Sequence, residues 1–168
     1  ASLLAFVDGE TAVLMPSAQD HKPIGEGDTG PNTGGMGAYS PAPVMTPELE
    51  ARAMREVIEP TVRALAKLGT PYKGILYAGL MIKDGDFKVL EFNCRFGDPE
   101  CQPLLMRMDS DLLPVLIACA TGNLANAVVS FSVEPAACVV MAAGGYPGDY
   151  RKGDVISWLN EANAIGGA

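Results

Sequence analysis

The chain has 168 residues, 48% of them hydrophobic and 19% charged, and its formal net charge at pH 7 is −8. This length and hydrophobic content suffice for a buried core, which excludes an intrinsically disordered protein. The 12 lysines and arginines are scattered along the sequence, and without a basic stripe we predict no nucleic-acid partner. An acidic protein that handles anionic substrates needs a cation to mediate between them.

The cysteines and the apolar runs indicate a reduced compartment and no membrane. The four cysteines form no C-x-x-C pair and no signal-peptide pattern is present, so we expect free thiols and a cytoplasmic location. The longest apolar run, Leu112 to Ala120, contains Pro114 and is far shorter than the ~20 residues that span a bilayer. Because the chain opens directly on an apolar run without an initiator Met, we expect a piece of a longer protein.

Two hairpins are predicted from Asp-Gly turns. The first joins the β-rich runs Ser2–Val7 and Thr11–Met15, and the second lies within "GILYAGLMIKDGDFKVLEFNC". Asp-Gly supplies the positive φ angles of a two-residue hairpin loop. Counting back from the second turn places Ala78 opposite Glu91, and it places Glu91 on the same strand face as Phe87 and Val89.

Helix signals follow each hairpin. Thr46 and Pro47 are typical of an N-cap and a first helical residue, and the apolar spacing after them predicts an amphipathic helix with a kink at Pro60. Asp111 predicts the cap of a second, mostly buried helix that Gly122 ends. Further on, the run "AACVVMAA" is a candidate for a buried strand.

The strand that ends in "VLEFNCRFGDPE" is the first candidate for chemistry. Glu91 and Asn93 lie two residues apart and share a face, and a carboxylate with an amide oxygen suits Mg²⁺. The planar guanidinium of Arg95 would then form paired hydrogen bonds with a carboxylate or phosphate. The triplet Glu-x-Asn also occurs at 161–163 without a strand signal, so only its place at the end of a buried-looking hairpin favours a site.

The glycine-rich segment "GEGDTGPNTGGMGAYSP", residues 25–41, is predicted to be neither helix nor strand. Such a loop can point successive backbone N–H groups at an anion, although many glycine-rich loops are only flexible connectors. The single histidine, His21, has no partner spacing for a catalytic triad or a zinc site. We therefore interpret it as a structural or supporting residue.

The segments "QDHKPIGEGDTGPNTGGMGAYSPAP", "GILYAGLMI", "EFNCRFGDPE" and "VVMAAGGYPGDYRKGDVI" closely resemble the phosphoribosylamine–glycine ligase family of ATP-grasp enzymes. The resemblance runs over nearly the whole chain. It implies an α+β fold, the second and larger lobe of an ATP-grasp domain, with an antiparallel sheet of hairpins packed by helices. It also implies that residues 1–127 form this lobe and that residues 128–168 begin a C-terminal, β-rich domain.

The resemblance implies an enzyme of purine biosynthesis that uses ATP to activate glycine as an acyl phosphate, which the amine of phosphoribosylamine then attacks. Glu91 and Asn93 would be the ligands of Mg²⁺, or of Mn²⁺. Arg95 would hold the carboxylate or acyl phosphate, and Asp98 would help to orient an amine. The residues implied to form or cover the substrate pocket are Asp28, Thr33, Gly34, Gly35 and Gly37.

Two departures from the family pattern limit these expectations. Many ATP-grasp enzymes carry another metal-binding acid on the strand paired with Glu-x-Asn, and here either fewer ligands hold the metals or a loop acid such as Asp20 or Asp28 contributes. The family's N-terminal domain and small lobe are also absent from the sequence, so we predict that this chain alone is inactive. The alternatives are a non-enzymatic module that binds an anion or metal, and a purely structural domain.

Overall fold

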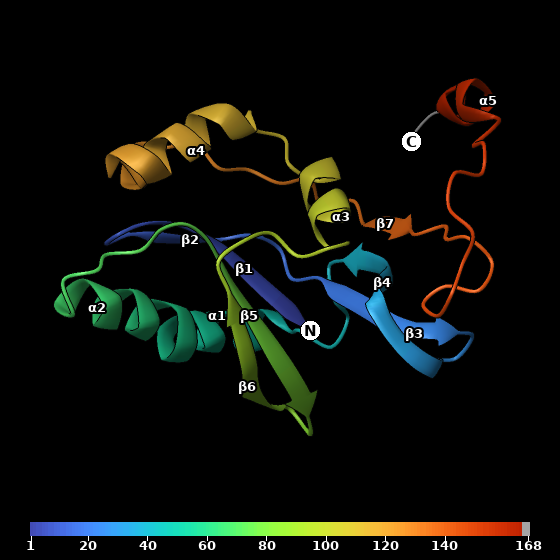
Figure 1. Cartoon of the computed structure of the whole chain (residues 1–168). Coiled ribbons are helices and arrows are strands. Elements are labelled where there is room, and N and C mark those ends of the chain that lie inside the picture. Colours follow the sequence, from blue (N-terminus) through green and yellow to red (C-terminus); the bar gives the residue numbers. More distant parts are fainter. Residues whose placement is uncertain (166–168) are drawn as a thin grey trace.

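Two antiparallel sheets form the framework of the computed structural model, which describes residues 1–165 (Figure 1). The four-stranded sheet has the order β2-β1-β5-β6 and the three-stranded sheet the order β3-β4-β7. The first contains β1 Ser2–Asp8, β2 Ala12–Leu14, β5 Lys73–Lys83 and β6 Asp86–Asn93. The second contains β3 Gln19–Gly25, β4 Thr29–Ser40 and β7 Ala136–Val139. The predicted α+β class with antiparallel hairpins is confirmed.

Helices cover both faces of the four-stranded sheet, as Figure 1 shows. Along β1 the side chains alternate between two core clusters, with Leu3 and Val7 in one and Leu4 and Phe6 in the other. The first cluster includes apolar side chains of the helical segment 47–67. The second includes side chains of α3 Cys101–Met106 and α4 Leu112–Thr121. Because β1 is buried on both faces, its sequence is a continuous apolar run.

The predicted amphipathic helix is divided into α1 Pro47–Ala53, a π-helical turn Met54–Ile58 and α2 Glu59–Lys67. Thr46 caps it as expected, because its side chain accepts a hydrogen bond from the Leu49 N–H. A kink was expected at Pro60, and the structure has the π-helical turn just before that residue. Proline has no N–H to donate within the helix, and a π turn is one way in which a helix accommodates the loss.

The second predicted helix is α4, capped by Asp111 and ended by Gly122 in the left-handed region at φ 77°. The expectation that it is mostly buried is wrong: Leu113 is 63% exposed and Ile117 54% exposed. Only the face with Val115 packs on the sheet. The short elements α3, the 3₁₀ turn Leu124–Asn126 and α5 Leu159–Asn163 were not predicted.

The second Asp-Gly hairpin forms, but its predicted register is wrong beyond the middle of the strands. Leu80 pairs with Val89 while Gly79 pairs with Glu91, so Leu90 is an extra residue, a β-bulge. Directly paired residues share a face, and the bulge therefore moves Glu91 to the face opposite Val89. A turn determines the register only as far as the first bulge.

The glycine-rich segment is also not the loop that was predicted, because most of it is strand β4, paired with β3 on one side and β7 on the other. The pairing is interrupted between His21↔Gly37 and Pro23↔Asn32. Lys22 therefore stands opposite the four residues 33–36, which form a wide bulge. Isolated glycine-rich sequence has little strand propensity, and strands on both sides supply the hydrogen bonds that stabilise it here.

Strand β7 lies at the edge of the three-stranded sheet, next to β4. It is shorter and less buried than predicted, since it ends at Val139, which is 83% exposed. The boundary expected near Val128 stays a prediction. Between residues 1 and 165, no helix is long and apolar enough to cross a membrane.

Candidate functional site

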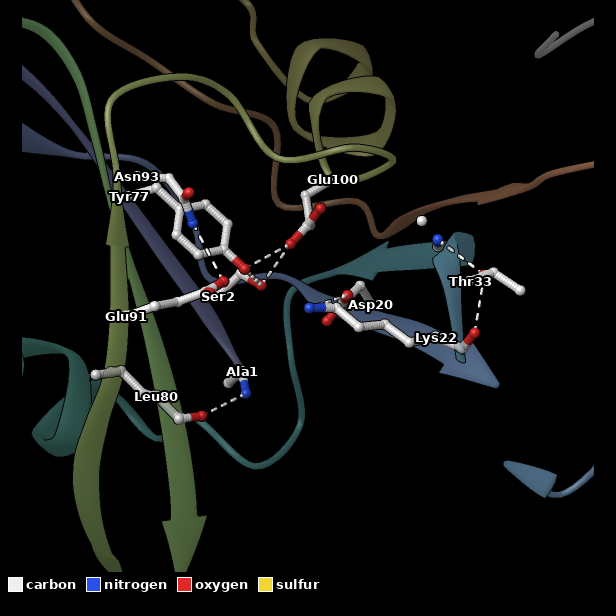
Figure 2. A network of polar contacts seen from close by, with 12 residues as sticks. Ala1, Ser2, Asp20, Lys22, Thr33, Tyr77, Leu80, Glu91, Asn93 and Glu100 are labelled. Atoms are coloured by element: carbon white, nitrogen blue, oxygen red, sulfur yellow. Dashed lines mark hydrogen bonds and ion pairs between the residues drawn. The ribbon is translucent and has the colours of Figure 1, made fainter. Parts of the chain in front are cut away.

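Glu91 and Asn93 lie at the end of β6, where the side-chain amide of Asn93 donates a hydrogen bond to Glu91 Oε1 at 3.1 Å. Both line a small polar cleft of about 50 Å³ between the two sheets, part of which is drawn in Figure 2. The cleft is lined by Asp20, Lys22, Gly34, Tyr77, Glu91, Asn93, Arg95, Gly97, Asp98 and Glu100. Four of the nine residues assigned a site role from the sequence are therefore side chains of one cleft, and Gly34 is a fifth lining residue.

The pair Glu91 and Asn93 suits a small divalent cation. Two ligand oxygens at adjacent corners of a magnesium octahedron with bonds of 2.0–2.1 Å are about 3 Å apart, close to the 3.1 Å between these two side chains. Rotation of the amide by half a turn would place its oxygen, in place of the nitrogen, beside the carboxylate. In the described part of the chain, no three His, Cys, Asp or Glu side chains are grouped to hold a metal.

Arg95 and Asp98 belong to the turn that follows β6. The strand ends at Asn93, before Arg95. The Arg95 guanidinium donates to the Phe96 carbonyl at 2.8 Å and is exposed, so most of its donors can reach a ligand. Both side chains border the cleft, which is the placement that their expected roles need.

The wide bulge of β4 brings backbone to the same cleft. Thr33 shapes it, because its hydroxyl donates to the Lys22 carbonyl at 2.8 Å and accepts from the Gly35 N–H at 3.0 Å. Gly35 is buried at φ 137°, where a Cβ would stand 2.8 Å from the Asp98 carbonyl oxygen and 2.5 Å from a carbon of Pro99. Only glycine fits this close approach. The bulge thus packs directly against the turn that carries Asp98.

Asp28 and Gly37 do not border the cleft. Asp28 lies in the turn between β3 and β4, with Oδ1 2.9 Å from Nδ1 of His21, which agrees with a supporting role for the histidine. Gly37 lies within the ladder between His21 and Val139, and a Cβ there would be 2.8 Å from the Cys138 carbonyl oxygen. Backbone packing therefore accounts for Gly37.

Of the two acids expected in loops, Asp20 lines the cleft and Asp28 does not, and Asp20 lies on strand β3 instead of a loop. Burial raises the pKa of the Asp20 carboxyl, the charge of Glu100 raises it further, and Lys22 opposes both, with its ammonium 3.8 Å from Asp20 Oδ2. The residues 19–25 form a strand, so alternation along β3 would have indicated that Asp20 and Lys22 share one face.

Ser2, Tyr77 and Glu100 form a buried polar cluster beside the cleft that was not predicted from the sequence (Figure 2). Glu100 Oε1 accepts from the Ser2 hydroxyl at 2.7 Å and from the Tyr77 hydroxyl at 2.9 Å. Burial raises the pKa of Tyr77 above its usual range, which keeps the phenol protonated as a donor. No local pattern signals this cluster, since its members are up to 98 residues apart.

The charges around the cleft favour cations. It has two more carboxylates than cationic side chains: Asp20, Glu91, Asp98 and Glu100 against Lys22 and Arg95. Such a lining attracts a divalent metal or an ammonium group. Arg95 provides a place for one carboxylate or phosphate within that acidic surrounding.

Comparison with known proteins identifies the family to which this chain is similar. Residues 1–101 match the family model described as phosphoribosylglycinamide synthetase, ATP-grasp (A) domain. The chain is 60% identical over 161 residues to a phosphoribosylamine–glycine ligase of Allochromatium vinosum, covering 95% of this chain and 38% of that protein. It is 56% identical to the ligase of Brucella melitensis, covering 99% of this chain and 39% of the relative. The chain thus spans about two fifths of the length of these relatives.

Solved structures show the same fold. The crystal structure of phosphoribosylamine–glycine ligase from Thermotoga maritima superposes with a TM-score of 0.70 at 35% identity, over 89% of this chain and 37% of that one. Urea carboxylase from Kluyveromyces lactis shares the fold at 15% identity, with a TM-score of 0.56 over 81% of this chain and 11% of that one. The family match and the relatives agree, and the chain belongs to the phosphoribosylglycinamide synthetase family, with residues 1–101 matching its ATP-grasp A domain.

Proposed function

We propose that this chain contributes one side of the active site of an ATP-dependent ligase. The reaction joins glycine to 5-phosphoribosylamine and yields glycinamide ribonucleotide, ADP and phosphate in purine biosynthesis. Relatives named phosphoribosylamine–glycine ligase are 55–60% identical to the chain. The observation that carries the proposal is the single cleft that contains Glu91, Asn93, Arg95, Asp98 and the Gly34 bulge.

Glu91 and Asn93 would hold Mg²⁺ or Mn²⁺, and the bound metal would neutralise ATP phosphates and the charge that develops during phosphoryl transfer. The two side chains are fixed relative to each other by position on one strand. Few protein ligands suffice, because Mg²⁺ usually keeps water and phosphate oxygens as its remaining ligands.

Arg95 and Asp98 would act on glycine and on the attacking amine. In the first step a carboxylate oxygen of glycine forms a bond to the γ-phosphorus as the bond to ADP breaks, and Arg95 would hold that carboxylate. In the second step the amine of phosphoribosylamine attacks the glycyl phosphate carbonyl and phosphate leaves. Asp98 would orient this amine, and the nitrogen loses one proton as the amide forms.

The β4 bulge would form a wall of the substrate pocket. Thr33, Gly34 and Gly35 are held beside the Asp98 turn, and backbone N–H groups in such a bulge can face an anion. Asp28 and Gly37, which lie outside the cleft, would support this wall indirectly through the turn and the ladder of the same hairpin.

The chain by itself would be inactive. The triphosphate of ATP carries several negative charges, whereas the cleft has only Lys22 and Arg95 as cations, so further contacts to the phosphates would come from the family's N-terminal and small-lobe regions. Partners are therefore small molecules and the rest of the protein. We propose a cytoplasmic location, although the relative from Arabidopsis thaliana is named chloroplastic.

The decisive experiment measures phosphate release from ATP by the full-length protein that contains this chain. We expect release only when both glycine and phosphoribosylamine are present, and Glu91→Ala should lower the rate by roughly a thousand-fold or more. The matched control is Glu134→Ala, which removes an exposed glutamate outside the cleft. Full activity of Glu91→Ala would refute the metal assignment. Metal binding without any substrate-dependent phosphate release would favour the non-enzymatic module.

A further inference from the structure

Tyr77 occupies a central place next to the proposed metal ligands. It lies on β5, directly opposite Asn93, and Gly79 on the same strand lies opposite Glu91. Paired residues share a face of the sheet, so the Tyr77 side chain stands beside Asn93, as Figure 2 shows. This placement depends on the Leu90 bulge, because regular pairing would have placed the two metal ligands on the other face.

The Tyr77 hydroxyl contacts both other members of the buried polar cluster. It donates to Glu100 Oε1 at 2.9 Å and lies 2.9 Å from the Ser2 hydroxyl oxygen. Ser2, Tyr77 and Glu100 are only 1%, 6% and 2% exposed. A buried carboxylate is costly unless it accepts hydrogen bonds, so the two hydroxyls hold Glu100 in one orientation.

The Glu100 side chain in turn lies against the turn that carries Asp98. A Cβ on Gly97 would clash with the Glu100 carboxylate, because the carboxyl carbon and both of its oxygens would lie within 2.9 Å of it. The carboxylate therefore takes the space that a side chain at position 97 would need. Moving Glu100 would allow this turn to shift, and with it Asp98 and the contact of Gly35 with Pro99.

We propose that Tyr77 is a positioning residue of the ligase: its hydroxyl fixes Glu100 and thereby holds the Asp98 turn at a set distance from Glu91 and Asn93. This role rests on the function proposed above. Tyr77 acts through Glu100 and does not itself contact the reacting atoms. Tyr77 thus connects the strand that carries Glu91 and Asn93, through Glu100, to the turn that carries Asp98.

The test compares Tyr77→Phe with Tyr72→Phe in the full-length ligase. Tyr72 is a matched control, because its hydroxyl also donates one hydrogen bond, to the Ile75 carbonyl at 2.6 Å, but it lies outside the cleft. Misplacement of a catalytic group by about 1 Å can cost roughly a hundred-fold in rate, so we expect Tyr77→Phe to lower kcat roughly 10- to 100-fold. The KM for ATP should stay within about two-fold, and Tyr72→Phe should keep kcat within about two-fold.

A purely structural role for the Tyr77 hydroxyl would give a different result. Both variants would then lose thermal stability to a similar extent and keep kcat, and that outcome would overturn the inference. If Tyr77→Phe does not fold, Ser2→Ala removes the other donor to Glu100 and should lower kcat in the same direction, by roughly 3- to 10-fold. Unchanged kcat in Ser2→Ala then overturns it. A wild-type protein without glycine-dependent phosphate release would instead refute the proposed function itself.

Discussion

The two hairpins that border the cleft contribute to it in different ways. The β5-β6 hairpin supplies side chains, Glu91 and Asn93, from a strand pair that continues into the buried sheet. The β3-β4 hairpin supplies a backbone wall, at the bulge around Gly35, together with the Asp20 and Lys22 side chains of a half-buried strand. Both depend on a break in register. A side-chain ligand must point to the correct face of the sheet. A backbone wall must approach the neighbouring turn closely, and at Gly35 only glycine leaves room for that approach.

This difference predicts how substitutions separate stability from activity. In the β5-β6 hairpin the side chains of Glu91 and Asn93 are exposed or partly exposed, so replacing them should affect activity far more than folding. In the β3-β4 hairpin the functional positions are close backbone contacts, so replacing them should affect both. The following predictions test this distinction, in order of the expected size of the effect.

The largest effect is expected at the β4 bulge. Gly35→Ala combines an unfavourable φ of 137° with a Cβ 2.8 Å from the Asp98 carbonyl oxygen, and should lower the free energy of unfolding by roughly 3 kcal/mol. Denaturant unfolding measures this change. The control is Gly27→Ala, where φ is also positive, at 65°, but nothing lies within 4 Å. The control should cost only about 1 kcal/mol, and equal losses would show that the close approach does not matter.

A smaller effect, on activity instead of stability, is expected at Gly79, which pairs with the proposed metal ligand Glu91. Gly79→Ala places a Cβ 3.0 Å from Cγ of Glu91, and the accessible glutamate must shift. We expect activity of the full-length ligase to fall roughly ten-fold, with the free energy of unfolding changed by less than about 1 kcal/mol. Gly144→Ala, which meets no atom within 4 Å, is the control. If Gly79→Ala is fully active, the exact direction of Glu91 is less important than the cleft suggests.

The smallest effect concerns Asp20 and depends on pH. Burial, and then the charge of Glu100, raise the pKa of this carboxyl above its ordinary value. The folded state therefore holds the proton more tightly than the unfolded state, and stability is lost as the pH rises from the unfolded pKa through the folded one. Asp20→Asn should thus be more stable than the wild type at pH 7, and this gain should disappear at a pH below both values.

Thermal unfolding of the wild type and Asp20→Asn across this acidic range measures the effect. Asp28→Asn, on the same hairpin but exposed and paired with His21, is the control and should show no such gain at neutral pH, since exposed ion pairs contribute little. A wild type that is more stable than Asp20→Asn at pH 7 would mean that the Lys22 contact outweighs the cost of burial.

Local sequence predicted those features that a few neighbouring residues control. The Asp84-Gly85 turn, the Thr46 cap and the Asp111 cap form as expected, because each depends on backbone preferences and hydrogen bonds within one turn. The first hairpin also forms, but Asp8 belongs to β1 and the loop lies at Gly9 and Glu10, one residue later than predicted. The choice of Glu91 and Asn93 as candidate ligands was also possible, since their chemistry and spacing are visible in the sequence. The alternation that would have placed Asp20 and Lys22 on one face was not recognised, because no strand was predicted for residues 19–25.

The sequence by itself determined the type of most elements, the family resemblance and the residues with metal-binding chemistry. Only the tertiary structure decided which way those residues face, because one extra residue, Leu90, reverses the side of the sheet for Glu91 and Asn93. Tertiary pairing also made the glycine-rich segment a strand. It brought Ser2, Tyr77 and Glu100 together from distant positions. Local propensities act over a few residues, whereas register and burial are settled by contacts between segments far apart in the chain.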